Sequence, residues 1–212
     1  MTTIGLKMNR IFNYLDKIIK EAKPELVYNK DYELLIAVML SAQTTDKGVN
    51  KVTKVLFDRY QTLEELSKAR LKDLEKIIKP IGTYYKKARN VKNTAIKLKT
   101  IGYVPNDRLF IESLPGVGRK TTNVVLSILY NEPYLAVDTH VERVAKRLRL
   151  AYKNDSVLTV ERKLTKKIPK ERVSKTHHQL VLFGRYYCRA RKPLCENCEL
   201  KDICKYYKKG TD

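Results

Sequence analysis

Apolar side chains recur at intervals of three and four residues along most of the chain. This spacing places them on one face of an α-helix, and it is clear in segments 11–22, 71–78 and 88–98. A further segment, 34–40, is apolar on every side, as in a helix buried at the centre of a domain. No comparable segment shows the alternation of apolar and polar residues that is typical of a β-strand. The predicted fold class is therefore all-α.

Capping residues and breaks mark the expected helix boundaries. Asp31 precedes the apolar segment 34–40 in the position of an N-cap, and Thr62 with Glu65 has the spacing of a capping box. Segments 80–82 and 102–105 contain glycine and proline and interrupt the helical pattern. A chain of 212 residues is long enough for one substantial hydrophobic core or two modest ones.

The chain is strongly basic. It has 44 Lys and Arg against 23 Asp and Glu, which gives a formal net charge of +21. A polyanion such as nucleic acid is the expected partner, although AT-rich coding also enriches a protein in lysine. The longest apolar run, 34–40, is too short to span a bilayer, and no signal peptide is evident. We therefore expect a soluble, cytoplasmic protein with no membrane partner.

The most informative segment is 114–126, Leu-Pro-Gly-Val-Gly-Arg-Lys-Thr-Thr-Asn-Val-Val-Leu. Gly116 and Gly118 have no Cβ, so the backbone can turn tightly and present its N–H groups to a partner. The positive end of the helix expected over 119–130 would add to these donors, and together they suit a phosphate. With a short helix over 107–113, the segment predicts a helix-hairpin-helix. An ordinary glycine C-cap between two helices is the alternative for this motif taken alone.

Two residues at the expected starts of helices are candidates for catalysis. Lys120 stands at the start of the helix expected after the hairpin, and Asp138 lies in Val-Asp-Thr-His, at the N-cap position of a later helix. The positive end of a helix favours a charged carboxylate, which can stabilise a developing cation or accept a proton. Considered singly, Lys120 has a simpler role in phosphate contact and Asp138 in capping. We interpret His140, beside Asp138, as a packing or hydrogen-bonding residue.

All four cysteines fall within seventeen residues, in the pattern Cys-x6-Cys-x2-Cys-x5-Cys. They are Cys188, Cys195, Cys198 and Cys204. In a reducing compartment this grouping indicates a metal site rather than two disulfides. Zinc and a 4Fe–4S cluster both accept four thiolates, and the presence of only one Cys-x2-Cys pair mildly disfavours zinc. The adjacent histidines 177 and 178 are expected to diverge on a helix and to be structural.

These motifs together resemble the endonuclease III family of the helix-hairpin-helix DNA glycosylase superfamily. The resemblance rests on segments 114–121, 137–140 and 40–46 and on the cysteine spacing, and it covers nearly the whole chain. It implies a bifunctional enzyme of base excision repair that removes oxidised pyrimidines from duplex DNA and nicks the abasic strand. It also implies a 4Fe–4S cluster. The implied domains are a six-helix barrel over 23–133 and an iron–sulfur cluster domain formed by 1–22 and 134–212.

The resemblance also implies roles for single residues. Lys120 would attack the sugar after losing its proton and form a Schiff base, and Asp138 would assist. Gln43 would fill the gap left by the flipped nucleotide. The loop 80–84 would wedge the strands apart, but Thr83 stands where a bulky apolar residue is expected, so the wedge would rest on Ile81 or Tyr84. A smaller departure, which concerns packing, is glutamine at 179 where tryptophan is common.

The resemblance implies that the partner is damaged double-stranded DNA and that no small-molecule cosubstrate is needed. We expect a monomer, associated with the nucleoid if the source is bacterial. The residues expected to contact DNA, besides Gln43 and Ile81, are Gly116, Gly118, Arg119, Arg189, Arg191 and Lys192. The last three lie between the first two cysteines and form a basic loop that a metal site would anchor; the alternative is a solvated run of charges.

Two other functions are compatible with parts of this pattern. A monofunctional glycosylase of the same superfamily would activate water instead of a lysine, but Lys120 argues against it. Such enzymes also carry an additional C-terminal domain, for which the eight residues after Cys204 leave no room. A DNA-binding module with a structural metal and no catalysis would have to retain Lys120 and Asp138 together by coincidence.

Overall fold

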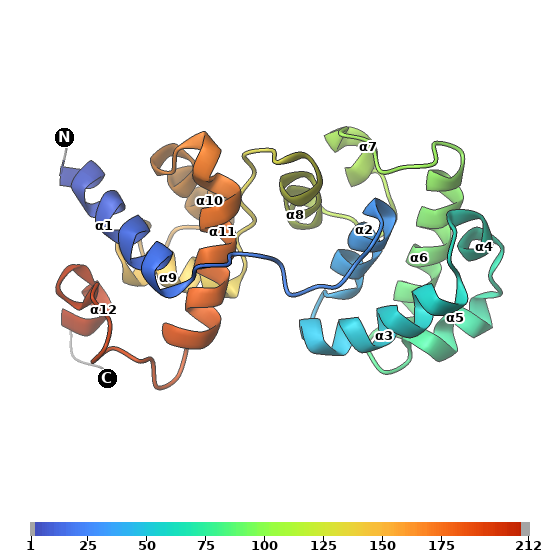
Figure 1. The fold of residues 1–212 in the computed structure, drawn as a ribbon, viewed down its shortest axis with the longest axis horizontal. Coiled ribbons are helices and arrows are strands. Elements are labelled where there is room, and N and C mark those ends of the chain that lie inside the picture. Colours follow the sequence, from blue (N-terminus) through green and yellow to red (C-terminus); the bar gives the residue numbers. More distant parts are fainter. Residues whose placement is uncertain (1–2, 209–212) are drawn as a thin grey trace. The chain divides into compact units, whose positions relative to one another are not determined.

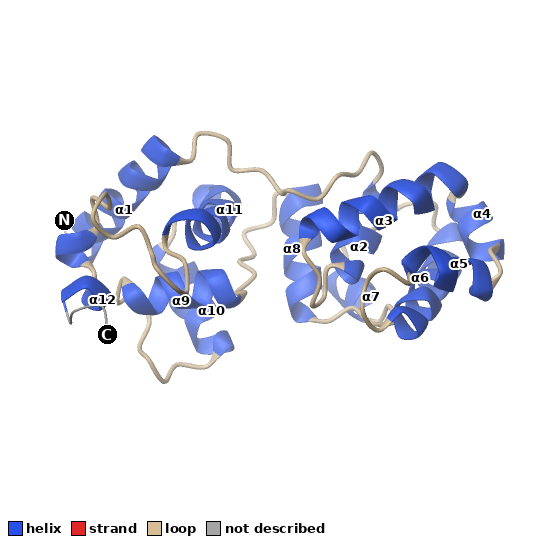
Figure 2. Cartoon of the chain, turned by 90° about the horizontal axis from the view of Figure 1, so that it is seen from below, coloured by secondary structure: helices blue, strands red, loops and turns tan. Residues whose placement is uncertain are grey.

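The computed structural model describes residues 3–208, and in this range the chain is helical and contains no β-strand (Figures 1 and 2). The helices form two compact units. One unit is the continuous segment Pro24–Tyr130, and the other combines Met1–Lys23 with Asn131–Asp212. Within residues 3–208, no helix combines the length and the apolar character needed to cross a membrane. The predicted all-α fold is confirmed.

The continuous unit is built around one buried helix. Its helices are α2 (Asp31–Leu40), α3 (Asp46–Arg59), α4 (Leu63–Lys68), α5 (Leu71–Ile78), α6 (Tyr84–Lys99), α7 (Arg108–Glu112) and α8 (Arg119–Tyr130). In α2 every residue from Tyr32 to Leu40 is buried. Helices α3, α6 and α8 pack against α2, and α4 and α5 pack against α6. The segment that is apolar on every side is therefore the central helix, as its pattern predicts.

Most of the predicted caps are present, but Asp31 has a different role. Thr62 and Glu65 form the expected capping box of α4, and Asp107 caps α7 through the N–H groups of Leu109 and Phe110. The N-cap of α2 is Lys30, so Asp31 is the first helical residue. The carboxylate of Asp31 accepts hydrogen bonds from its neighbour Tyr32 N–H at 2.7 Å and from Val104 N–H at 2.6 Å. Asp31 thus ties the start of α2 to the loop before α7.

The discontinuous unit joins the first helix to the last third of the chain. Its elements are α1 (Thr3–Ile18), α9 (Thr139–Arg147), α10 (Val157–Lys167), the short helix Lys170–Arg172, α11 (Val173–Leu182), a π-helical turn over Phe183–Tyr187, the short helix Lys201–Ile203 and α12 (Lys205–Lys208). The helix predicted over 11–22 ends at Ile18. Buried residues of α1, including Ile11 and Leu15, share a core with Val141 and Val144 of α9 and Leu180 of α11.

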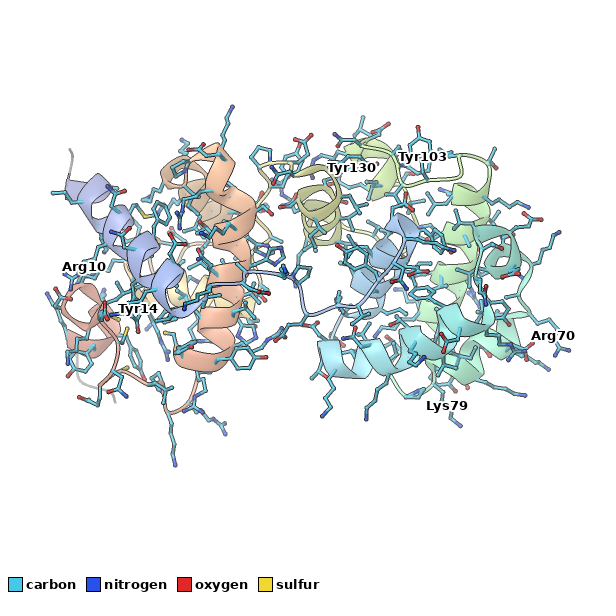
Figure 3. All side chains as sticks on the ribbon, in the orientation of Figure 1. Arg10, Tyr14, Arg70, Lys79, Tyr103 and Tyr130 are labelled. Atoms are coloured by element: carbon cyan, nitrogen blue, oxygen red, sulfur yellow. The ribbon has the colours of Figure 1, made fainter. Side chains whose placement is uncertain are left out.

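Polar contacts fix α1 to the C-terminal segment. Arg10 forms an ion pair with Asp202 and donates to the Glu199 carbonyl at 2.9 Å, and Lys17 pairs with Glu199. Arg10 and Tyr14 both extend from α1 toward that segment (Figure 3). The exposed ion pairs add little stability singly, but they fix the register of α1 against the segment that holds the cysteines.

Candidate functional site

The helix-hairpin-helix motif is present, with α7 and α8 joined by residues 113–118. Leu114 and Val117 are buried and anchor the hairpin in the core, and the N–H of Val117 donates to the Leu114 carbonyl at 3.1 Å. Gly116 and Gly118 are exposed. Within residues 3–208, neither of their N–H groups has an acceptor. The hairpin therefore holds its apolar residues inside and two unused backbone donors outside.

The two glycines of the hairpin differ in what the fold requires of them. Gly116 has φ +79°, and a Cβ there would lie 2.2 Å from Asn90 Nδ2 on α6. Gly118 has no such constraint: a Cβ at this position meets nothing within 4 Å, and its φ lies outside the left-handed region. The fold itself thus needs glycine at 116. At 118 the fold tolerates a side chain, so a glycine there keeps the surface open for close approach by a partner.

Lys120 is the second residue of α8 and is exposed. In the described part of the chain, its ammonium forms no ion pair or hydrogen bond. Arg119 is exposed beside it. Lys120 is therefore accessible, and within residues 3–208 no ion pair or hydrogen bond holds its ammonium.

Gln43 lies in the turn between α2 and α3 and has a left-handed backbone conformation, with φ 56°. Its side chain is exposed and forms no hydrogen bond with the described residues. Non-glycine residues in this conformation cost on the order of 1–3 kcal/mol and cluster at functional sites. The sequence gives no sign of this backbone strain.

The loop before α6 does not present Ile81 as a wedge. The Ile81 side chain is only 3% exposed and packs in the core of the unit, so in this conformation it is not available to insert into DNA. Thr83 is exposed and has φ 57°. This is unusual for a β-branched residue. Tyr84 and Tyr85 follow, with ring centroids 3.9 Å apart, and the contact with Tyr85 raises the pKa of Tyr84 to about 12.

Asp138 is the N-cap of α9, as predicted. Its Oδ1 accepts hydrogen bonds from the N–H groups of His140 at 2.9 Å and Val141 at 2.8 Å. Its Oδ2 has no hydrogen-bond partner among the described residues. One carboxylate oxygen therefore caps the helix while the other is free for chemistry. His140 lies beside Arg143, whose Nη2 is 3.2 Å from its Nδ1.

The four cysteines line one pocket of the discontinuous unit. The pocket has about 430 Å³ of empty space, part of it open to solvent, and apart from Lys201 its other walls are apolar or aromatic, including Tyr14, Leu148 and Phe183. No three His, Cys, Asp or Glu side chains within residues 3–208 converge closely enough to hold a single metal ion. Four thiolate donors lining one pocket match the ligand set of a 4Fe–4S cluster.

Arg143, Arg147 and Tyr14 support this pocket, and no sequence motif marks them. Arg147 Nη1 lies 3.4 Å from Cys188 Sγ and donates to the Arg189 carbonyl at 2.7 Å, while its guanidinium stacks on Tyr206. Arg143 donates to the Cys188 carbonyl at 3.1 Å. Burial raises the pKa of Tyr14 to about 12, so its hydroxyl stays protonated beside Cys198. In the sequence, the only sign that Arg143 and Arg147 act together is their spacing of four residues, which places both on one face of a helix.

The basic loop between the first two cysteines is exposed. Arg189, Arg191 and Lys192 all lie at the surface, and Arg189 Nη2 donates to the Lys192 carbonyl at 2.9 Å. Arg147 holds the start of the loop through the carbonyls of Arg189 and Ala190. The loop is therefore ordered, and its three cations remain available to an anion.

Gln179, His177 and His178 are buried. Gln179 Nε2 donates to Asp16 Oδ1 at 2.8 Å, so this residue links α11 to α1 by a hydrogen bond. The two histidine side chains are expected to diverge, but their ring centroids lie only 4.9 Å apart. Burial lowers the pKa of His178 to about 4, which keeps its imidazole neutral.

Known proteins account for this combination of features. Residues 36–170 match the HhH-GPD superfamily of base excision DNA repair proteins, and residues 188–204 match the iron-sulfur binding domain of endonuclease III. Endonuclease III of Bacillus subtilis is 47% identical over 205 residues, with 94% of each chain covered. That of Rickettsia felis is 46% identical over 203 residues, again with 94% of each covered. The chain belongs to the endonuclease III family.

The fold agrees with solved endonuclease III structures. A trapped endonuclease III–DNA covalent intermediate superposes with a TM-score of 0.92 at 47% identity, and all of both chains is covered. The match of the cysteine segment to the endonuclease III iron-sulfur domain confirms a 4Fe–4S cluster over zinc. When bound, that cluster would be held by the four cysteines and would fix the loop that carries the basic residues.

Proposed function

We propose that Lys120 is the nucleophile of a bifunctional DNA glycosylase and abasic-site lyase. Membership of the endonuclease III family shows that the chain is a glycosylase and lyase of base excision repair. The finer assignment is excision of oxidised pyrimidines from duplex DNA, followed by β-elimination through a lysine Schiff base. The observation that supports it best is the exposed, unpaired Lys120 next to the open hairpin.

The chemistry follows from an unprotonated lysine. Nζ of Lys120 attacks C1′ of the damaged nucleotide, and the glycosidic bond breaks as the base leaves with the bonding electron pair and takes up a proton. Opening of the sugar ring gives a Schiff base between Nζ and C1′. This cation acidifies the C2′ hydrogen, and its loss expels the 3′ phosphate with the C–O bonding pair. Water then hydrolyses the Schiff base and regenerates the amine.

We assign Asp138 to the positive charge that develops at C1′ as the base departs. Its Oδ1 is engaged in the cap of α9, and the Oδ2 that no described residue engages supplies the negative charge. A carboxylate that is already oriented by its cap needs no reorganisation when the charge appears. Capping and catalysis are thus served by different atoms of one side chain.

We assign DNA contact to the exposed groups of three segments. The hairpin contributes the N–H groups of Gly116 and Gly118 and the Arg119 side chain, which suit a phosphate. Gln43 occupies the space left when the damaged nucleotide leaves the stack. The cluster-supported basic loop contributes Arg189, Arg191 and Lys192. The net charge of +21 supports a further proposal, that the protein associates with the nucleoid in a bacterial cell.

We also assign functions to the two parts of the chain. Residues 23–133 act as the barrel domain, which carries the hairpin, and residues 1–22 with 134–212 act as the iron–sulfur domain. The proposal is supported by the location of Lys120 in one compact unit and of the cysteines in the other. On this proposal the protein acts as a monomer.

Borohydride trapping on a duplex with one thymine glycol or abasic site tests the nucleophile. The wild type should give a covalent adduct, whereas Lys120→Ala and Lys120→Arg should give none and should not nick the strand. The arginine variant keeps the positive charge, so it separates loss of the Schiff base from loss of DNA affinity. An adduct in either variant would assign the chemistry to another amine. No adduct with wild-type protein that still releases bases would indicate a monofunctional glycosylase.

A further inference from the structure

Lys87 is a buried lysine that the reaction proposed above does not use. It lies in the first turn of α6 and is 8% exposed. Lysine is almost never buried without a partner, because removing an ammonium from water is costly. No carboxylate pairs with Lys87 among the described residues, and burial lowers its pKa. Such a residue needs a structural or functional reason.

The hydrogen bonds of Lys87 go to both sides of Gln43. Its Nζ donates to the Ala42 carbonyl at 2.9 Å and to Thr44 Oγ1 at 3.1 Å. Gln43, between these two acceptors, has the strained φ of 56° and an exposed side chain. The ammonium thus holds the residue on each side of Gln43, through the Ala42 backbone and the Thr44 hydroxyl, and makes no hydrogen bond with the Gln43 side chain.

Lys87 also belongs to the turn that carries the second strained residue of this unit. Its N–H donates to the Thr83 carbonyl at 3.1 Å, the first hydrogen bond of α6. Thr83 has φ 57°. Strained conformations persist only where the surrounding structure holds them. One residue therefore connects, by its backbone and its side chain, the two strained turns at 41–45 and 80–83.

The same face of α6 supports the hairpin. Asn90 lies one turn after Lys87 and contacts the position of Gly116. Lys97, two turns further, donates to the Ser113 carbonyl at 3.0 Å. Spacings of three residues (Lys87 to Asn90) and seven residues (Asn90 to Lys97) place these side chains on one side of the helix. Helix α6 thus sets the relative positions of the turn 80–83, the Gln43 turn and the hairpin, and the last two bear residues assigned to DNA contact.

We propose that Lys87 is a positioning residue that holds the Gln43 turn in the shape needed to recognise the gap beside a flipped-out nucleotide. The inference rests on the proposed function, because it requires that Gln43 enters the gap. Lys87 itself touches neither the substrate nor the reacting atoms. Its effect is exerted through the backbone of Ala42 and the hydroxyl of Thr44.

A double-mutant cycle tests this role. The measured quantity is the ratio of affinities for a duplex with a tetrahydrofuran abasic analogue and for the undamaged duplex, at one salt concentration. Gln43→Ala should lower this ratio on the order of tenfold, and Lys87→Met should lower it to a similar extent. The double variant should show no further loss, because both changes remove the same interaction. A purely structural role for Lys87 would instead give additive losses.

A neighbouring lysine provides the control. Lys86 is exposed on the same turn of α6 and forms no hydrogen bond with the described residues. Lys86→Met removes the same charge and should leave the affinity ratio unchanged. If Lys87→Met does not fold, Thr44→Val removes one of the two acceptors; it should lower the ratio by a smaller factor, and that loss should not add to that of Gln43→Ala.

The outcomes separate the proposed role of Gln43 in filling the gap from the positioning role of Lys87. If Gln43→Ala leaves the ratio unchanged, the proposed role of Gln43 is wrong and the inference fails with it, although trapping at Lys120 stands as an independent test of the chemistry. If Gln43→Ala lowers the ratio but Lys87→Met and Thr44→Val do not, only the positioning role is overturned. Additive losses would overturn it as well.

Discussion

The two hairpin glycines should respond in opposite ways to replacement by alanine. At Gly116 an alanine must adopt φ +79° and must displace Asn90, whose Nδ2 would lie 2.2 Å from the new Cβ. The left-handed conformation costs about 1–2 kcal/mol and the overlap about 1–3 kcal/mol. Gly116→Ala should therefore lower the free energy of unfolding by about 2–5 kcal/mol. For a chain of this length, that is a fall in Tm on the order of 10 °C.

At Gly118 nothing in the fold opposes a methyl group. Gly118→Ala should leave stability unchanged or raise it by about 0.4–1 kcal/mol, because the unfolded chain loses freedom. Its affinity for duplex DNA should nonetheless fall about tenfold, since the methyl group obstructs the donors that approach the phosphate and a hydrogen bond to a charged group contributes about 1.5–3 kcal/mol. The two variants thus separate folding from binding.

Thermal unfolding and DNA binding at fixed salt, measured for both variants, check this reasoning. A second substitution locates the cause: Asn90→Ala in the Gly116→Ala background removes the overlap but not the backbone strain, so it should restore about half of the lost stability. Equal losses of Tm in the two glycine variants would refute the structural argument. Unchanged DNA affinity in Gly118→Ala would refute the assignment of this glycine to phosphate contact.

Three further predictions concern single groups. Asp138→Asn should keep the Tm, because asparagine caps a helix as well as aspartate does, but base release should fall by at least about tenfold; equal activity would exclude a role for the carboxylate charge. Folded His178, whose pKa is about 4, binds no proton at pH 5, whereas the unfolded chain does, so stability should fall by about 2 kcal/mol between pH 7 and pH 5. In His178→Gln, urea unfolding should show this loss reduced, and an unchanged loss would contradict the assignment. Replacing Arg189, Arg191 and Lys192 by glutamine should make the salt dependence of DNA binding shallower by roughly 2–3 in log–log slope, and an unchanged slope would place the loop away from the phosphates.

Much of the helical fold follows from local sequence patterns. The helix 119–130 and the caps at Thr62 and Asp138 are found as expected, because capping and helical periodicity depend on residues only a few positions apart. The error at Asp31 arose from a contact that is distant in sequence: its carboxylate receives the Val104 N–H. A pattern read within one turn contains no information about such a partner.

The site shows the same division. The sequence motifs identified the exposed residues of the hairpin and the four cysteines, because glycines and cysteines at these spacings are unusual outside binding sites. Burial of Ile81 and the contacts of Lys87 could not be predicted, since each depends on how distant helices pack. Sequence favoured an apolar residue for the wedge; the structure shows that in Ile81 the same apolar character serves the core.

The discontinuous unit has a consequence for biosynthesis. Residues 24–130 form a compact unit from one uninterrupted stretch of chain, so this unit can fold while the ribosome is still translating the rest. Helix α1 is made first, but it packs against α11 and is tied by Arg10 and Lys17 to Asp202 and Glu199. It must therefore wait, with its apolar face uncovered, until the last cysteines emerge. Completion of this unit therefore requires the segment that carries the cysteines.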